Sequence, residues 1–489
     1  MNRYLPIIVV AIPILGGLVI PLIKDEHRKA RCFYIETLVL INTALVFFTL
    51  MNNSGEACEV IRFTGDLSIS FKIDGLSTVF SALIAFLWPL ATLYSFEYMT
   101  KEKRESVFFM FYTMTYGVTL GIAMAEDFIT MYCFYEMLTL VTVPLVIHTL
   151  TREAILAARK YLYFSLGGAA FAFIGMIFII TYGTSNSFIF GGVLDMDKVG
   201  SKVGVLQLIY VLTFMGFSVK AAMFPFCGWL PQAGVAPTPV TALLHAVAVV
   251  KSGAFAIIRI TYFSFGTDFV RGTIAQYVVM GFTIFTIVYG CSKALKETHL
   301  KRRLAYSTIS NLSYILFGVT LMTPLGLVGA VTHLVFHALM KISSFFCAGA
   351  IMHQTEKHYI HELNGLGRKM PVTFVIFTVS SLALMGVPGL AGFISKWNLA
   401  TAAVDSGNTL AYVGIGALLV SALLTAIYMM SIVMRAFEPG PDFDDSKIKD
   451  YSDPNALMLL PLIIFTICIV VFGLYSQPFV DFFKQIAGL

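Results

Sequence analysis

Charged residues are scarce in this sequence, since Asp, Glu, Lys and Arg together make up 12% of its 489 residues. Soluble globular proteins carry about 25%. Long polar stretches are also missing, because the four longest are about 20 residues each and lie at 52–74, 185–203, 354–370 and 437–455. The scarcity of charge excludes a soluble protein, and the short polar stretches leave no room for a soluble catalytic domain.

Sequence signatures of metal sites, redox cofactors and secretion are missing as well. The cysteines form no CxxC pair and no spacing typical of metal ligands, so we predict no metal and interpret them as apolar packing residues. They are Cys32, Cys58, Cys133, Cys227, Cys291, Cys347 and Cys468. No redox or hydrolytic site is visible, and we predict no cofactor in this chain. The N-terminus lacks a basic leader and a cleavage site, which predicts that its first apolar stretch is retained.

Apolar residues are what the sequence has in abundance. They make up 58% of the chain, and the mean hydropathy is +0.82. Apolar stretches of about 20 residues, enough to cross a hydrocarbon core of about 30 Å as a helix, recur from end to end. We therefore predict an all-α polytopic membrane protein of fourteen spans. The predicted spans are 4–23, 31–51, 75–96, 107–125, 128–149, 160–184, 204–226, 237–262, 274–297, 301–322, 327–353, 371–396, 410–436 and 456–484.

Positive residues are distributed unevenly between the two sides of the predicted membrane. Loops after odd-numbered spans hold twenty-one of the 33 Lys and Arg residues, and the opposite loops and termini hold seven. Positively charged loops stay in the cytoplasm, so this bias predicts a prokaryotic inner-membrane protein with both termini outside. The net charge of +5 is then explained by the positive residues of the cytoplasmic loops. We therefore predict that the chain lies in a lipid bilayer and does not bind nucleic acid.

The other five Lys and Arg residues fall inside predicted spans, at Lys220, Lys251, Arg259, Lys341 and Lys396. A lysine near the bilayer centre costs roughly 2.5–3.5 kcal/mol, so a helix keeps one only where a partner, water or a function compensates. Arg259 lies near the outer end of its span and is expected to snorkel to the headgroups without a functional role. The four lysines are therefore candidate functional residues.

Glu136 lies in the middle of the fifth predicted span. An unpaired carboxylate at that depth is neutral or needs a cation. Lys220 in the seventh span is the candidate partner, although a single sequence does not establish that two separate helices meet.

Three titratable residues recur every fourth position in the eleventh predicted span, at His333, His337 and Lys341. This spacing places them on one stripe of a helix over about 12 Å. Imidazole titrates near neutrality, and removal from water lowers the pKa of a lysine toward the same range. Residues of both kinds can therefore accept and release protons, so the stripe can relay them. The alternative is that the histidines only hydrogen-bond to helix carbonyls in a tight bundle.

His245 and Lys251 share the eighth predicted span but are six residues apart. On one continuous helix they would lie about 120° apart, so they would flank an interior path and not share a stripe. A haem site needs histidines on facing helices, and His148 and His245 make no such two-helix pattern.

Proline and glycine interrupt two predicted spans, near Pro225 in the seventh and at Pro388 in the twelfth. An interrupted helix is tolerated in a membrane only beside protein or a water-filled cavity. Breaks in corresponding positions predict inverted repeats. We predict one membrane domain, 1–489, that consists of three spans in 1–106, five-span repeats in 107–262 and 274–436, and a last span at 456–484.

Four long runs of residues resemble a known family: KAAMFPFCGWLPQAGVAPTPVTALLHAVAVVKSG, LKRRLAYSTISNLSYILFGV, HLVFHALMKISSFFCAGAIMH and PGLAGFISKW. Through them the chain resembles the antiporter-like subunits shared by respiratory complex I, membrane-bound hydrogenases and Mrp-type cation/proton antiporters. The resemblance spans nearly the whole chain and is strongest from 110 to 400. It implies two inverted five-helix repeats, each with a discontinuous helix, around a hydrated polar axis at the membrane midplane.

The resemblance also implies a role for each buried ionisable residue. Glu136 and Lys220 match the family's charge pair, and Lys251 matches its connecting lysine. Protonation at the Lys220 site changes its attraction to Glu136, and the altered field shifts the next lysines, so charge moves by coupled titration. His245 matches the family's histidine in the eighth span, and Lys396 matches its terminal lysine. The central relay is matched by His333, His337 and Lys341.

The sequence departs from the family pattern PFHxWLPxAH at Cys227 and Gly234, where many relatives have histidine. This departure puts proton entry through that loop in doubt. The chain stops soon after its last span and so looks more like the D-type component of an Mrp antiporter or a hydrogenase-linked homologue. The implied partners are homologous antiporter-like subunits, small membrane subunits and, in a redox-driven complex, a redox module. The implied ions are H⁺ and, in an antiporter, Na⁺.

Proton translocation within a larger ion-pumping complex is the predicted function. A stand-alone secondary transporter of a small solute would also use broken helices and predicts substrate uptake by the protein alone. A membrane redox enzyme would need paired haem ligands or a quinone pocket, and a haem absorbance band would reveal the first.

Overall fold

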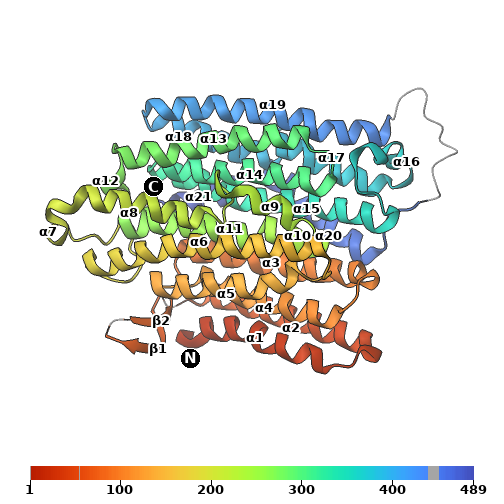
Figure 1. The fold of residues 1–489 in the computed structure, drawn as a ribbon, viewed down its shortest axis with the longest axis horizontal. Helices are drawn as coiled ribbons and strands as arrows, with labels where there is room; N and C mark the ends of the chain where they lie inside the picture. The colour runs from red at the N-terminus through yellow and green to blue at the C-terminus, as the bar shows by residue number, and fades with distance from the viewer. Residues whose placement is uncertain (1, 54, 66, 439–450) are drawn as a thin grey trace. The chain divides into compact units, whose positions relative to one another are not determined.

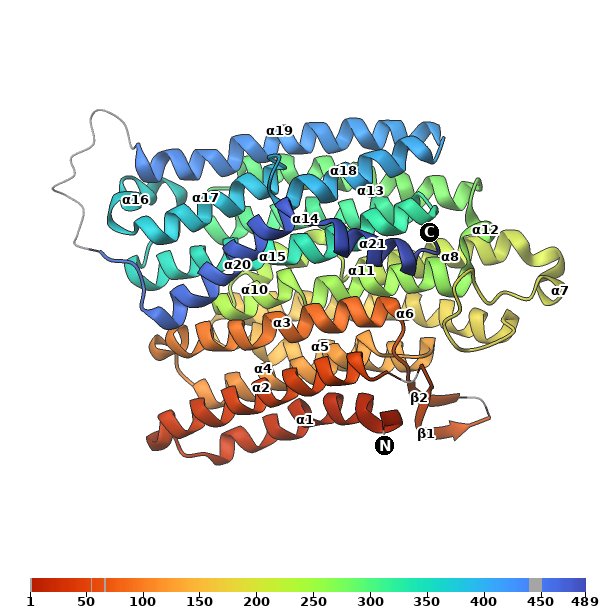
Figure 2. The same cartoon turned by 180° about the vertical axis from the view of Figure 1, so that it is seen from behind.

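The structure, a computed structural model, describes residues 2–53, 55–65, 67–438 and 451–489. The chain forms two compact units whose segments alternate along the sequence. The first comprises Met1–Leu90, Lys103–Phe226 and Val247–Gly281, and the second comprises Ala91–Glu102, Cys227–Ala246 and Phe282–Leu489. Helices make up most of each unit (Figure 1 and Figure 2).

The first unit is built from helices that pack side by side. They are α1 (Leu5–Val19), α2 (Arg28–Met51), α4 (Glu105–Ala123), α5 (Phe128–Val146), α6 (Arg152–Tyr182), α7 (Met196–Val199), α8 (Val203–Ser218), α11 (Val249–Arg259) and α12 (Thr267–Val270). α1 packs on α4, α4 on α5 and α6 on α8. A Cβ atom at Gly117 of α4 would lie 2.4 Å from the carbonyl oxygen of Val10 in α1, so only glycine permits this approach.

The second unit surrounds one long buried helix, α15 (Pro324–Thr355), in which every residue from Gly326 to His353 is buried. α15 packs against α10, α14, α17, α18 and α20. The other helices are α9 (Leu230–Ala233), α10 (Thr238–Ala246), α14 (Leu300–Thr320), α16 (Leu366–Lys369), α17 (Pro371–Met385), α18 (Ala391–Asp405), α19 (Thr409–Phe437), α20 (Ala456–Leu474) and α21 (Gln477–Ile486). A helix that carries apolar residues all round its circumference suits such an interior, and α15 adds to them the titratable residues His333, His337 and Lys341. Two helices, α3 (Gly75–Tyr98) and α13 (Ile274–Lys296), contribute to both units.

Twelve helices among the described residues are long and apolar enough to cross a membrane, and the chain is a multi-pass membrane protein. Two of the fourteen predicted spans lie outside this set. Predicted span 301–322 is the helix α14, whose first turn contains three consecutive basic residues and whose middle is rich in Ser, Thr and Asn. Predicted span 371–396 is divided between α17 and α18 by residues 386–390.

The polar loop 52–74 corrects the all-α prediction, because it contains a β-hairpin. Strands β1 (Cys58–Thr64) and β2 (Leu67–Phe71) pair antiparallel, with Cys58 opposite Phe71. β-branched and aromatic residues favour strands here, and Gly65 takes the positive φ of 52° at the turn. The predictions for the membrane spans treated this segment only as a loop.

The eighth predicted span is not one continuous helix. α10 ends at Ala246 and α11 begins at Val249, and a π-helix follows at Ile260–Phe265. The angle of about 120° expected between His245 and Lys251 assumed an unbroken helix, and the interruption after Ala246 contradicts that assumption. The two residues belong to different units.

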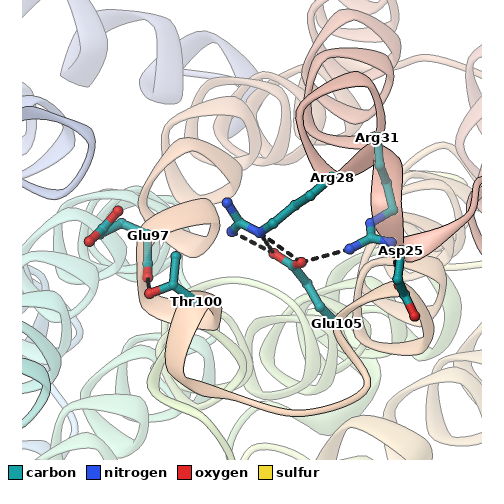
Figure 3. A network of polar contacts seen from close by, with 6 residues as sticks. All are labelled: Asp25, Arg28, Arg31, Glu97, Thr100 and Glu105. Carbon is teal, nitrogen blue, oxygen red and sulfur yellow. Dashed lines mark hydrogen bonds and ion pairs between the residues drawn. The ribbon is translucent and has the colours of Figure 1, made fainter.

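Ion pairs connect the start of α2 to the start of α4 (Figure 3). Arg28 donates to the two carboxylate oxygens of Glu105 at 2.7 and 2.9 Å. Arg31, which is 2% exposed, donates to Glu105 at 2.7 Å and to Asp25 at 2.5 Å. The Glu105 carboxylate therefore balances two guanidinium groups, one of them buried.

Replacing Glu105 with glutamine should lower the free energy of unfolding by about 1–3 kcal/mol, because it leaves the buried Arg31 with less compensating charge. Thermal unfolding of the purified protein in detergent measures this loss. Glu26→Gln is the matched control, since Glu26 is an exposed carboxylate next to Asp25. Equal stability of the two variants would contradict a structural role for the network.

Candidate functional site

Lys220 lies in a helix break of the first unit. α8 ends at Ser218, and residues 219–225 form turns in which Ala222 has a positive φ of 54° and Pro225 comes last. α11 approaches this break closely, because a Cβ atom at Gly253 would lie 2.6 Å from the backbone nitrogen of Ala221. The break removes Lys220 from regular helix and leaves its fully buried ammonium free to reach α5.

The Lys220 ammonium contacts Tyr135 of α5 in two ways. It donates to the Tyr135 carbonyl oxygen, and it lies 3.4 Å from the centroid of the Tyr135 ring. Both contacts stabilise a cation without neutralising it, because a carbonyl dipole and an aromatic face carry no net charge. The ammonium is therefore held in place and still open to the influence of a nearby carboxylate.

Glu136, the next residue on α5, supplies that carboxylate. Lys220 and Glu136 interact electrostatically, but the two described side chains form no ion pair within 4.0 Å. The buried Oε1 of Glu136 has no hydrogen-bond partner among the described residues. The structure thus brings the predicted partners into one site without a direct bond, so either group can change protonation without breaking an ion pair.

The two predicted residues of the eighth span, His245 and Lys251, are also buried. Lys251 occupies the first turn of α11 in the first unit and has no exposed surface. His245 lies in the last turn of α10 in the second unit, where its ring centroid is 4.7 Å from that of Phe345 in α15.

Cys227 and Gly234, the positions that depart from the family pattern, lie in the segment that follows the break. Cys227 is buried in the short 3-10 helix Phe226–Trp229. Gly234 is the C-cap residue of α9 and has a φ of −60°, an ordinary right-handed conformation that does not require glycine.

The titratable stripe of α15 makes polar contacts with two neighbouring helices. The rings of His333 and His337 stack with centroids 5.4 Å apart and planes 14° apart. His333 Nδ1 lies 2.9 Å from the Ser395 hydroxyl of α18. Lys341 donates to the Ser307 hydroxyl of α14 at 2.7 Å. All three predicted residues are fully buried, and these hydroxyl partners are neutral.

Lys396 closes the second helix break. Its ammonium donates to the carbonyl oxygens of Leu384 and Met385 at 2.7 and 3.0 Å. These carbonyls belong to the last turn of α17, where helix carbonyls lack partners and the helix dipole is negative. Pro388 lies within the break, and Gly386 and Gly389 on either side of it have φ values of 94° and 87°.

Sequence reasoning missed the hydroxyl and ring groups that lie between the charged residues. The Tyr314 ring has its centroid 5.1 Å from that of His333 and 5.4 Å from the Lys396 ammonium. The Tyr428 hydroxyl donates to Ser307 at 2.8 Å. Tyr314 and Ser307 fall in the quoted run LKRRLAYSTISNLSYILFGV, whose many hydroxyl residues were the available signal. Tyr428 lies on α19 with no such pattern.

Arg259 does not snorkel to the membrane surface, so that expectation was wrong. Its side chain is 1% exposed and donates to Asp74 and to the Ser77 hydroxyl, each at 2.9 Å. The rings of Phe188, Phe255 and Phe263 lie 4.8–5.2 Å from its guanidinium carbon. Arg259 joins α11 to the residue before α3.

Acid should weaken the pair of Asp74 and Arg259. Burial by itself raises the pKa of Asp74, but the Arg259 charge and the hydrogen bonds from Arg259 and Ser77 outweigh it and lower this pKa from 3.8 to about 2. A lowered folded-state pKa gives stability that is present above about pH 4 and is lost as the pH falls toward 2. Because Asp74 is one-third exposed, we expect about 1–2 kcal/mol.

Unfolding temperatures measured in detergent between pH 5 and pH 2 test this prediction. Asp74→Asn should flatten the pH dependence, whereas Asp197→Asn, at an exposed position of α7, should keep it. An unchanged slope in Asp74→Asn would contradict the assignment.

Comparison with known protein families assigns the chain to one of them. The family described as NADH:quinone oxidoreductase/Mrp antiporter, TM, matches residues 125–425, more than half of the chain. The N-terminal region of complex I chain 5 matches residues 62–109. The chain belongs to the NADH:quinone oxidoreductase/Mrp antiporter family.

Curated relatives cover almost all of the chain. NADH-quinone oxidoreductase subunit N of Desulforudis audaxviator is 28% identical over 498 residues, which cover 98% of each protein. A Na⁺/H⁺ antiporter subunit of Alkalihalophilus pseudofirmus is also 28% identical, over 95% of this chain. This chain spans only 60% of that antiporter protein.

Solved structures share the fold. A chain of the Mrp complex from a Dietzia species superposes with a TM-score of 0.84 at 21% identity, covering 100% of this chain and 97% of that one. A chain of the archaeal membrane-bound sulfane sulfur reductase superposes with a TM-score of 0.83 at 23% identity, covering 99% and 97%. Both similar chains are parts of multi-subunit membrane complexes.

Proposed function

We propose that this chain is a proton-translocating subunit of a multi-subunit ion-pumping membrane complex. The observation that carries the proposal is the buried Lys220 ammonium, which is held by neutral groups of Tyr135 and interacts with Glu136 without a direct ion pair. Membership of the family supports it. A stable bonded pair would resist titration, whereas this arrangement responds to a change in nearby charge.

The proposed route has a part in each unit. In the first unit, Glu136 and Lys220 form the input pair and Lys251 connects onward. In the second unit, protons pass along α15 and end at Lys396, with Tyr314 and Ser395 as neutral neighbours that orient the titrating groups. The proposed relay residues are His245, His333, His337 and Lys341.

The finer architecture is part of the same proposal. Fourteen spans would form inverted repeats at 107–262 and 274–436, between the N-terminal segment 1–106 and the last span 456–484. The breaks at 219–225 and 386–390 support this division, because the first contains the buried Lys220 and the Lys396 ammonium bonds to carbonyl oxygens at the edge of the second. The excess of Lys and Arg in odd-numbered loops supports a prokaryotic inner membrane with both termini outside.

The proposed partners are homologous antiporter-like subunits and small membrane subunits. Relatives named as quinone oxidoreductase and as Na⁺/H⁺ antiporter subunits both align with this chain. A redox module would supply the energy in the first kind of complex, and in the second the gradient of one ion would drive the exchange of Na⁺ for H⁺.

Deletion of the gene, followed by proton-flux measurements, tests the function. Inverted membrane vesicles from the deletion strain should lose the dye-reported proton movement that NADH, hydrogen or a Na⁺ gradient drives, and the intact gene should restore it. Unchanged proton movement, together with solute uptake by the purified chain alone, would replace the proposal with a stand-alone transporter.

A further inference from the structure

A small pocket of the second unit lies apart from the buried lysines. It has a volume of about 270 Å³ and is formed where α13 ends, α14 begins and α19 ends. Its polar lining includes Arg303, Arg435, His361 and Thr298. Arg303 belongs to the run LKRRLAYSTISNLSYILFGV, and the proposed proton route makes no use of it.

The two arginines in this pocket lack a bonded counter-ion among the described residues. Arg303 donates to the carbonyl oxygens of Glu297 and Tyr428 at 2.8 and 2.9 Å and to the Ser431 hydroxyl at 2.8 Å. These groups position the guanidinium but do not neutralise it. Arg435 is exposed, and its charge repels that of Arg303.

Glu297 is the carboxylate with an electrostatic effect on Arg303. Its Oε1 accepts the backbone N–H groups of Thr298 and His299, each at 3.0 Å. The carboxylate is therefore engaged with its own turn and attracts Arg303 only at a distance. A bound anion would relieve the repulsion between the arginines.

The rest of the pocket lining is mainly apolar and reaches the surface of the protein. Leu295 and Ile427 line the pocket and are 37% and 50% exposed. Pockets that enclose a drug-sized molecule have about 300–1,000 Å³, so this one suits a headgroup whose hydrocarbon chains lie outside along such side chains. All its elements adjoin loops that the distribution of Lys and Arg assigns to the cytoplasmic side.

We propose that this pocket binds the phosphate of an anionic phospholipid. Guanidinium groups bind phosphate through paired, charge-assisted hydrogen bonds, and basic pockets between membrane helices on the cytoplasmic side suit anionic headgroups. The proposal depends on the membrane location of the chain and not on proton translocation.

Lipid retention tests the proposal. The purified protein, in its complex, is exchanged into nanodiscs of phosphatidylglycerol and phosphatidylcholine, extracted with mild detergent, and its bound lipid is counted by mass spectrometry. The native protein should retain phosphatidylglycerol preferentially, and Arg435→Gln should reduce that preference about tenfold through the loss of one charged contact. Arg302→Gln is the matched control, because Arg302 is an exposed arginine next to Arg303 that does not line the pocket.

Arg435 is exposed, so its replacement should leave folding intact, and a thermal unfolding scan verifies this. Equal retention by Arg435→Gln and Arg302→Gln would overturn the proposal. Displacement of the retained lipid by excess inorganic phosphate would also overturn it, in favour of a site for soluble anions. Retention of phosphatidylcholine at the same level as phosphatidylglycerol would overturn it too, because the hydrocarbon chains alone would then account for the contact.

Discussion

Replacing Lys220 with alanine is expected to abolish proton translocation while the complex still assembles. Lys220 is fully buried, and its ammonium contacts a neutral carbonyl and an aromatic ring, so its loss breaks no direct ion pair. The loss instead removes the cation that acts on Glu136. Proton movement in sealed vesicles should fall to the level of vesicles without the complex, and the amount of assembled complex should stay near normal.

Two further variants make this result specific. Glu136→Gln should give the same loss, because it keeps the shape of the side chain and removes its charge. Lys202→Ala should pump normally, since Lys202 is exposed and donates to the Tyr182 hydroxyl at 2.7 Å, away from the buried pair. Normal pumping by either Lys220→Ala or Glu136→Gln would remove this pair from the mechanism.

Replacing Lys396 is expected to block translocation at the other end of the route. Lys396→Ala also removes the donor that serves two carbonyls at the end of α17, which should cost about 1–3 kcal/mol of stability. Lys396→Arg separates the two effects, because arginine keeps a charged donor but does not release a proton at working pH. We expect Lys396→Arg to unfold near the native temperature and to be inactive in vesicles.

Cys227→Ala is the control for this second prediction. Cys227 is a buried residue of the same unit, and its replacement should reduce translocation only mildly. Full activity of Lys396→Arg would mean that Lys396 only caps α17. Full activity of Lys396→Ala would mean that the route ends elsewhere.

Most candidate residues of the site could be named from the sequence because burial of charge is costly. A lysine such as Lys341 in an apolar helix stands out without any knowledge of its neighbours. The spacing of His333 and His337 likewise predicts a shared helix face, and their rings do stack. Their relay function remains a prediction.

The same reasoning failed where a long-range contact decides the role of a residue. Arg259 was expected at the headgroups because its position near a span end was the only information available. Its partner Asp74 is 185 residues away in the sequence. Tyr428 was missed for a similar reason, because a tyrosine in the apolar helix α19 carries no sign of which group it will approach.

By itself, the sequence determined that this is a multi-pass membrane protein with ionisable groups inside its spans. Hydropathy and burial cost are properties of each segment, so they can be read locally. Only the tertiary structure decided the partners of these groups, such as the α17 carbonyls that hold Lys396 and the Tyr135 carbonyl that holds Lys220. A partner depends on which distant helices pack together and where a helix ends, and no single segment encodes that.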